Sequence, residues 1–146
     1  MGARFIPIAE KFFVSPQISE KDIAEAKARG VTLIINNRPD GEALFQPKAA
    51  ELKAAAEAAG ISYVDIPVSR AGISPDHLDA FDRAVLDNDG ATLAFCRTGT
   101  RSTMLRALAC ARAGAAADEI LNEAANAGYD LGPYKRMLES LAAQKG

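Results

Sequence analysis

The stretch ATLAFCRTGTRS, residues 91–102, joins an apolar run to a loop that carries a cysteine, a glycine and two arginines. The run from Ala91 to Phe95 predicts a buried strand, and a long helical pattern begins at Ser102. Strand, loop and helix in this order form the unit from which parallel α/β sheets are built. The stretch therefore indicates the fold class and gathers chemically active side chains in one loop.

Strand-like and helix-like segments alternate through the rest of the chain. Strands are expected at residues 11–17, 31–36, 61–68 and 91–95, and helices at residues 19–30, 47–59, 74–88 and from 102 onward. This alternation predicts an α/β fold with a mostly parallel sheet of four to five strands, flanked by helices. Ligands of such sheets bind in loops beyond the carboxyl ends of the strands, where Cys96, Arg38 and Asp40 are expected.

Two of the predicted helices carry recognisable start signals. Ser19 followed by Asp22 is a relative of the capping box, and Ser74 followed by Pro75 is typical of a cap and a first helical position. We therefore expect helices to begin at both serines.

The composition favours a small globular protein without a metal or a cofactor. The 146 residues suit one domain, and residues 1–146 are expected to form it. A net charge of −2 without a basic run gives no indication of nucleic acid or a membrane as a partner. No apolar run approaches the roughly 20 residues of a spanning helix, and two cysteines make no disulfide framework, so a cytoplasmic location is expected. A single histidine argues against a zinc site.

Cys96 is the predicted nucleophile of the loop, and Arg101 is the predicted ligand of a bound oxyanion. The thiolate is the reactive form of cysteine, and a helix start, inward-pointing amides and two arginines all favour it. Arg101 offers a planar fork to two oxygens. The other loop residues expected to bind the oxyanion are Arg97, Thr98, Gly99, Thr100 and Ser102. The competing interpretation, a small buried cysteine that ends a strand, gives no role to the two arginines.

Four segments of the chain carry a family resemblance: VSPQIS (14–19), INNRPDGE (35–42), AAAEAAGISYVDIPV (54–68) and LAFCRTGTRS (93–102). Together they resemble the bacterial phosphatase-like domain of beta-lactamase-hydrolase-like proteins. The resemblance implies the fold of the dual-specificity protein tyrosine phosphatases, with an active-site loop similar to that of rhodanese sulfurtransferases. Some family members are fused to a metallo-β-lactamase-fold persulfide dioxygenase, which implies a role in sulfide or persulfide metabolism and such a dioxygenase as a partner in trans.

The length of the loop favours sulfur transfer over phosphate hydrolysis. Four residues lie between Cys96 and Arg101, which matches the rhodanese pattern C-R-x-G-x-R, whereas tyrosine-phosphatase loops are one residue longer. Ser69 and Arg70 stand where dual-specificity phosphatases carry their acid. The main expectation is a sulfurtransferase that takes a small oxyanion or persulfide, thiosulfate or glutathione persulfide, and forms a persulfide on Cys96. The alternatives are a phosphatase with a Cys96 phosphoenzyme and a non-catalytic module that binds an oxyanion or a phosphoprotein.

Asp40 and Arg38 each have two open roles. Asp40 is either a turn former or a general acid that reaches the loop. Arg38 either holds the turn by pairing with Asp40 or Glu42, or it extends the anion site.

The tail beyond Gly128 has no assigned role. It carries Tyr129, Tyr134 and Met137 in a helical pattern. Docking on the domain and an interface with another molecule are both consistent with these residues.

Overall fold

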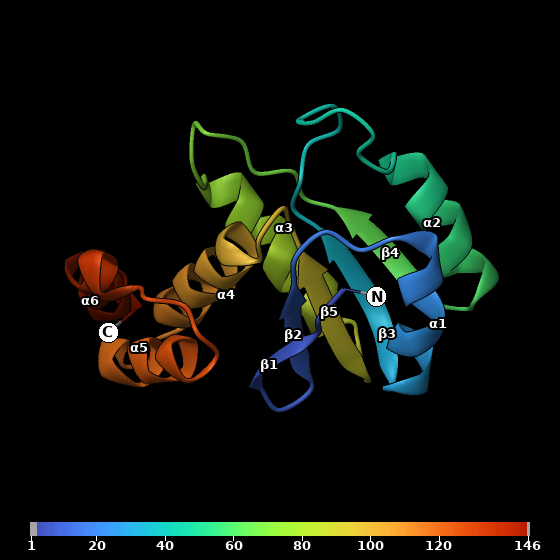
Figure 1. Ribbon diagram of the computed structural model, residues 1–146. Coiled ribbons are helices and arrows are strands. Elements are labelled where there is room, and N and C mark those ends of the chain that lie inside the picture. Colours follow the sequence, from blue (N-terminus) through green and yellow to red (C-terminus); the bar gives the residue numbers. More distant parts are fainter. Residues whose placement is uncertain (1–2, 146) are drawn as a thin grey trace.

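The computed structural model describes residues 3–145 and shows a five-stranded sheet flanked by helices (Figure 1). The strands lie in the order β1-β2-β5-β3-β4, and among them β1 alone runs antiparallel to its neighbour. Their bounds are Ile6–Ala9 for β1, Phe12–Ser15 for β2, Val31–Asn36 for β3, Ser62–Asp65 for β4 and Ala91–Phe95 for β5. The predicted α/β class and mostly parallel sheet are confirmed.

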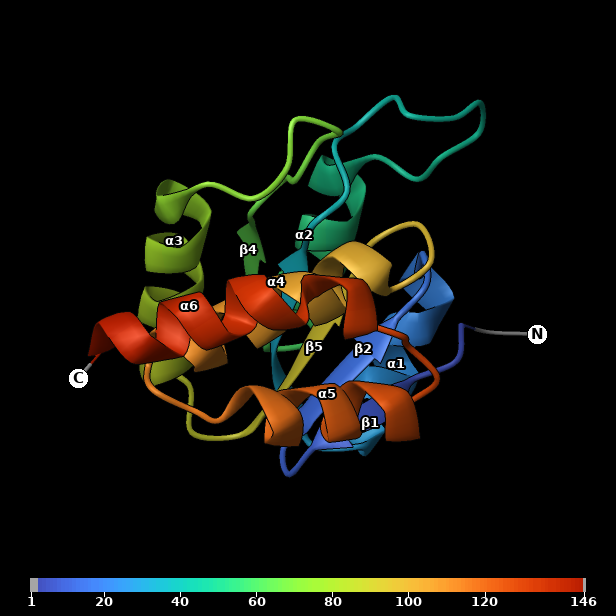
Figure 2. The ribbon, with the colours of Figure 1, turned by 90° about the vertical axis from the view of Figure 1, so that its left-hand side faces the viewer.

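Helices cover both faces of the sheet (Figures 1 and 2). Their bounds are Glu20–Ala28 for α1, Ala49–Ala58 for α2, Pro75–Leu86 for α3, Thr100–Arg112 for α4, Ala117–Asn126 for α5, Gly132–Tyr134 for the 3₁₀ helix η1 and Lys135–Lys145 for α6. Helices α1 and α2 lie on one face and α3, α4 and α5 on the other, where α6 packs outside α4 and α5. Within residues 3–145 no helix combines the length and the hydropathy needed to cross a membrane.

The central strands separate two hydrophobic cores. Successive side chains of a strand point to opposite faces, so Ile34 and Ile35 enter different cores. Phe95 joins Ile34 in the core under α1 and α2, and Ala94 joins Ile35 in the core under α3 to α6. Strands buried on both faces explain the continuous apolar runs in the sequence.

The two predicted helix starts are confirmed. The backbone amide of Ser19 donates to the Asp22 carboxylate at 2.8 Å before α1. Before α3, the backbone amide of Ser74 donates to Nδ1 of His77 at 2.9 Å, and the His77 amide donates to the Ser74 hydroxyl. These bonds satisfy amides that have no partner within the helix.

Strand β1 is the element that the sequence analysis missed. It spans Ile6–Ala9, contains Pro7 and pairs with β2 at the edge of the sheet. Proline lacks an amide hydrogen and disrupts a central strand, but an edge strand has one side without a partner strand and tolerates it. The edge position of β1 therefore explains why Pro7 does not prevent strand formation.

A buried asparagine, Asn37, joins three strands and a helix at the carboxyl edge of the sheet. Its amide donates to the carbonyl of Phe95 at 2.8 Å, and its carbonyl accepts from the amide of Val68 at 2.9 Å. Its side-chain Nδ2 donates to the carbonyl of Ile66 at 2.9 Å, and its Oδ1 accepts from the Ser102 hydroxyl at 2.7 Å. Asn37 thus fixes the ends of β3, β4 and β5 relative to the first turn of α4.

We predict that Asn37→Leu lowers the free energy of unfolding by about 3 kcal/mol, because it leaves a buried hydroxyl and a buried carbonyl without partners. Denaturant unfolding followed by circular dichroism measures the change. Asn122→Leu, at an exposed position of α5, is the matched control and is expected to change the free energy by less than about 0.5 kcal/mol. Equal stability of the Asn37 variant and the unchanged protein would contradict the role assigned to this amide.

Candidate active site

The loop from Cys96 to Arg101 closes on the sulfur of Cys96. This cysteine follows β5 and is fully buried, and the amide of Gly99 donates to its Sγ at 3.0 Å. Gly99 has a φ of +93°, in the left-handed region, and turns the chain directly into α4. The helix consequently begins at Thr100 and not at Ser102, as the sequence pattern had indicated. The sulfur therefore lies beside the Gly99 amide at the beginning of a helix, a favourable place for negative charge.

Two residues, Glu42 and Val68, hold the guanidinium of Arg101. Its Nη1 donates to Oε2 of Glu42 at 2.8 Å and to the carbonyl of Val68 at 2.7 Å, and its Nη2 donates to Oε1 of Glu42 at 2.9 Å. Arginine has five N–H groups, and these contacts use three of them. Within residues 3–145, Nε and one hydrogen of Nη2 have no oxygen acceptor, so one edge of the guanidinium is available to a ligand or to the nearby Cys96 sulfur.

Glu42 is ionised and sits between two arginines. Hydrogen bonds from Arg101 lower its pKa from 4.5 to about 2, Arg38 acts in the same direction, and burial acts against both. Pairing with Glu42 raises the pKa of Arg101, and the nearby Cys96 sulfur adds to this effect. Glu42 is therefore a positioning residue that holds the arginine beside the cysteine.

Arg38 is the second arginine that binds the Glu42 carboxylate. Its side chain is buried, and Nε donates to Oε1 of Glu42 at 2.9 Å while Nη1 donates to Gln17 at 3.0 Å. Of the two roles left open for Arg38, the structure places it in the turn, paired with Glu42.

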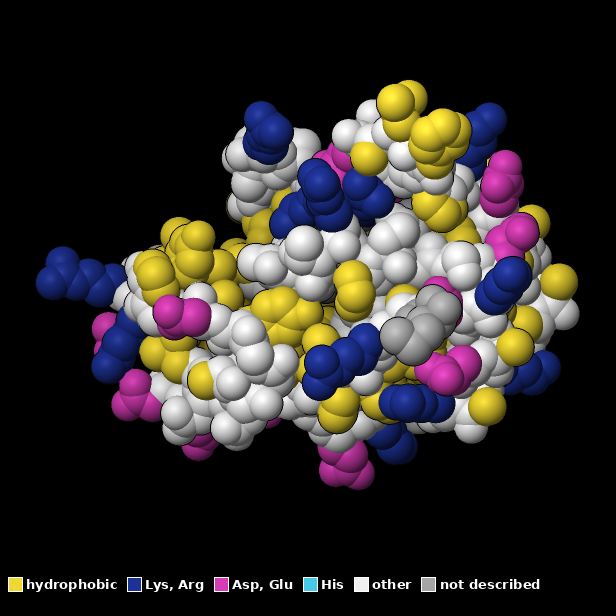
Figure 3. Space-filling view, viewed as in Figure 1, with side chains coloured by type: hydrophobic (Ala, Val, Ile, Leu, Met, Phe, Trp, Pro, Cys, Tyr) yellow, Lys and Arg dark blue, Asp and Glu magenta, His cyan; other side chains and the backbone are white. Residues whose placement is uncertain are grey.

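A cationic pocket of about 530 Å³ borders the loop from Cys96 to Arg101. It lies between the segments 37–48 and 66–74, which form the two projections at the top of Figure 3, with Lys and Arg side chains between them. Its lining residues are Glu42, Ser69, Arg70, Arg97 and Arg101. Three arginines against one carboxylate make the pocket attractive to anions.

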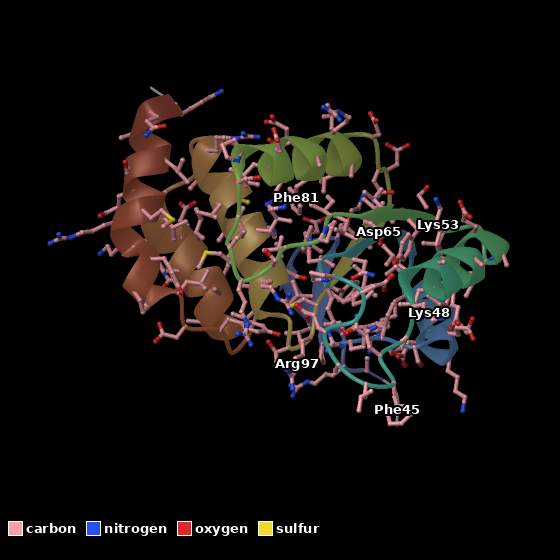
Figure 4. All side chains as sticks on the ribbon, turned by 90° about the horizontal axis from the view of Figure 1, so that it is seen from above. Phe45, Lys48, Lys53, Asp65, Phe81 and Arg97 are labelled. Carbon is pink, nitrogen blue, oxygen red and sulfur yellow. The ribbon has the colours of Figure 1, made fainter. Side chains whose placement is uncertain are left out.

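Figure 4 shows the outer edge of this region from above. Arg97 belongs to the 96–101 loop, and Phe45 lies on the same side of the molecule at the edge of the 37–48 segment. Phe45 is 99% exposed. Arg97 lines the pocket, whereas Phe45 does not.

The hydroxyl residues of the loop have different roles. Ser102 is buried, and its hydroxyl donates a hydrogen bond to Asn37. This bond anchors the first turn of α4, which follows the loop. Thr98 and Thr100 are linked through their hydroxyls at 3.0 Å on the exposed side, apart from the sulfur. The Tyr129 hydroxyl donates to the carbonyl of Thr98 at 3.1 Å, which ties the tail to the loop.

Asp40 lies outside the cationic pocket. Its Oδ1 accepts from the amide of Ala49 at 2.9 Å, at the beginning of α2. This bond gives Asp40 a structural role at the start of α2, away from the pocket, and not the general-acid role. Among the described residues, the one carboxylate that lines the pocket is Glu42, which is ionised and bound to arginine.

Sequence reasoning did not identify Glu42 and Asn37 as parts of the site. Glu42 was considered as a partner for Arg38, four positions away, but its main partner is Arg101. Contacts between residues so far apart leave no local pattern, although both residues lie in the polar segment that follows β3.

Comparisons with known proteins agree on the family. A family model described as "Beta-lactamase hydrolase-like protein, phosphatase-like domain" matches residues 4–115. The "Beta-lactamase hydrolase-like protein" of Xylella fastidiosa strain 9a5c is 35% identical over 142 residues, and that of Agrobacterium fabrum strain C58 is 34% identical over 139 residues. These matches cover 97% and 94% of this chain, but 33% and 32% of those proteins. The chain spans about a third of the length of these relatives.

Solved structures share the fold. A Neisseria meningitidis Z2491 protein described as a "putative phosphatase" has a TM-score of 0.82 and 31% identity, with coverage of 93% of this chain and 96% of that chain. A Shewanella putrefaciens CN-32 protein of the same description has a TM-score of 0.73 and 20% identity, covering 99% and 95%. Tk-PTP in its active form has a TM-score of 0.71 and 15% identity, covering 96% and 97%. The expected tyrosine-phosphatase-like fold is confirmed.

The prediction of a sulfurtransferase is wrong, because the family and the solved structures that match this chain are phosphatase-like. That prediction treated the short loop as a cradle for a single sulfur atom. In the structure the short loop closes through Gly99 alone, and Arg101 borders a pocket of about 530 Å³. A water molecule takes roughly 30 Å³, so this pocket has ample room for a phosphoryl group.

We predict that Gly99→Ala destabilises the protein by about 2–3 kcal/mol, because the new Cβ combines left-handed strain with overlap of the Tyr129 hydroxyl. Denaturant unfolding measures the loss. Gly60→Ala is the matched control: its φ is +80° and no atom lies within 4 Å of the added Cβ, so we expect about 1 kcal/mol. Equal losses at the two positions would show that Tyr129 does not confine the loop.

We predict that Glu42→Gln lowers the free energy of unfolding by about 1–3 kcal/mol at pH 7, because charged hydrogen bonds to two arginines are lost. The folded pKa of Glu42, about 2, lies below its ordinary value of 4.5. Its contribution is therefore complete above pH 4.5 and is lost as the pH falls toward 2. Denaturant unfolding of both proteins at several pH values should show their difference shrinking in this window; a difference independent of pH would contradict the ion pair.

Proposed function

Because the chain belongs to the family of phosphatase-like domains of beta-lactamase hydrolase-like proteins, we propose that it is a cysteine-dependent phosphatase that forms a phosphoenzyme on Cys96. The observation that carries the proposal is the Arg101 guanidinium, which is fixed by Glu42 and Val68 and presents a free edge at a cationic pocket. A fixed arginine fork, a cysteine sulfur and an amide directed at that sulfur are groups that serve a phosphoryl transfer to sulfur.

Substrate binding uses the free edge of Arg101. Nε and Nη2 would donate to two oxygens of the phosphate, in the bidentate geometry that guanidinium groups prefer. Arg97 and Arg70 line the same pocket and add positive charge. A phosphate bound there would lie near Cys96, because the Cys96 sulfur neighbours the Arg101 guanidinium, although Cys96 does not itself line the pocket.

The first chemical step forms a bond between sulfur and phosphorus. The Cys96 thiolate attacks phosphorus while the bond from phosphorus to the ester oxygen breaks, and the released alkoxide or phenoxide takes a proton from solvent. Arg101 and the loop amides stabilise the charge on the phosphoryl oxygens. In the second step water attacks phosphorus, the S–P bond breaks, phosphate leaves and the thiolate is restored.

The missing acid selects among possible substrates. Glu42 is ionised and Asp40 is bound to α2, so neither is placed to protonate a leaving oxygen. A phenoxide leaves without help far more readily than an alkoxide. We therefore propose that phosphotyrosine-like aryl phosphates are better substrates than phosphoserine or phosphothreonine.

We predict that the protein releases phosphate from a phosphotyrosine peptide at least about a hundredfold faster than from the matched phosphoserine peptide, in kcat/KM, because general-acid help to the leaving group is absent. Phosphate release by the purified protein measures both rates. In a quench during turnover, intact mass spectrometry should find the protein heavier by one phosphoryl group.

Two cysteine variants test whether Cys96 carries the phosphoryl group. Cys96→Ser should abolish phosphate release, whereas Cys110→Ser, which removes the other cysteine, should retain it. Phosphate release that survives loss of the Cys96 thiol would exclude the phosphoenzyme, and equal rates on the two peptides would exclude the substrate preference.

A further inference from the structure

An apolar groove of about 290 Å³ lies beside the cationic pocket. It is formed by the segment 66–74 on one side and by α4, η1 and α6 on the others. The apolar residues that line it include Val68, Ile73, Met104, Leu108, Tyr134 and Met137.

The groove and the cationic pocket share a wall. Ser69 and Arg101 line both of them. The guanidinium that is available to a phosphate therefore stands at one end of an apolar surface, and Figure 3 shows hydrophobic side chains over α6 and the adjoining part of α4, next to the Lys and Arg side chains. A ligand that reaches both spaces must combine an anion with a neighbouring apolar group.

The tail leaves apolar surface uncovered at this groove. Leu138 of α6 is fully buried, but Tyr134 and Met137 are 42% and 49% exposed. Both lie beyond residues 4–115, so the family match does not describe them. The C-terminal elements η1 and α6 thus supply one wall of the groove, and the segment 66–74 and α4 supply the rest.

We infer that this groove binds an apolar side chain adjacent to the phosphorylated residue of a peptide substrate. The inference rests on the proposed function, since it places the phosphate in the cationic pocket. In-line attack points the leaving oxygen away from the Cys96 sulfur, so the residue next to the phosphorylated one is the part that can turn into the groove. An apolar cavity of about 150 Å³ accommodates benzene, so this groove has room for a leucine or phenylalanine side chain.

The test compares phosphotyrosine peptides that differ in one neighbouring residue. One pair carries leucine or glutamine directly after phosphotyrosine, and a second pair carries them directly before it. The leaving group is the same in all four peptides, so the chemistry does not differ. In at least one pair we expect kcat/KM to be about fivefold higher with leucine, from burial of its side chain.

Two variants show whether the groove causes this preference. Met137→Gln keeps the size of the side chain but makes the groove polar, and it should reduce the preference to about twofold or less. Leu86→Gln is the matched control, since Leu86 is 84% exposed at the end of α3 and does not line the groove. It should leave both the rates and the preference unchanged.

The possible outcomes separate the inference from the proposed function. Equal rates with leucine and glutamine in both pairs would overturn the inference that the groove binds the neighbouring side chain. A preference that Met137→Gln does not alter would overturn it as well. If no peptide is hydrolysed, the proposed function fails. Calorimetry of peptide binding to the Cys96→Ser protein then tests whether the groove binds the neighbouring side chain. Tighter binding of a leucine peptide that is lost in Met137→Gln supports it, and equal binding overturns it.

Discussion

The hydrogen bonds of the buried Asn37 are the constraint on which the candidate active site depends. Its backbone and side chain bind groups on β5, on the segment after β4 and on the first turn of α4. A buried polar group that loses its partner costs more free energy than an average hydrogen bond contributes. The amide therefore admits one arrangement of these elements. Val68 belongs to the same network, and its carbonyl accepts a hydrogen bond from Arg101. The position of Arg101 at the cationic pocket therefore depends on the arrangement of the strand ends.

The position of the arginine, more than the length of the loop, defines the chemistry of this site. Loop length alone favours the rhodanese pattern. The structure, however, fixes Arg101 through Glu42 from a different segment, and the loop borders a pocket with room for a tetrahedral anion. A short loop can thus occur within a phosphatase-like fold when the arginine is held from outside the loop.

Local signals in the sequence were sufficient for most of the fold. Strands β3 and β5 have the expected bounds, and the caps at Ser19 and Ser74 form as the residue types indicate. The contacts that assemble the site were not predictable, because they join residues far apart: Arg101 and Glu42 are 59 positions apart, and Ser102 and Asn37 are 65. Periodicity and capping rules act within a few turns or one strand, so they contain no information about such pairs.

The fixed arginine has an energetic consequence. A free arginine side chain carries about 2 kcal/mol of rotamer entropy, which it loses when it grips an anion. In this protein Glu42 and the Val68 carbonyl impose that loss during folding, before any ligand arrives. The arginine is therefore preorganised: the proposed binding of a phosphate would demand little further ordering of it, and the rigid spacing of Nε and Nη2 would discriminate against anions whose oxygens do not fit it.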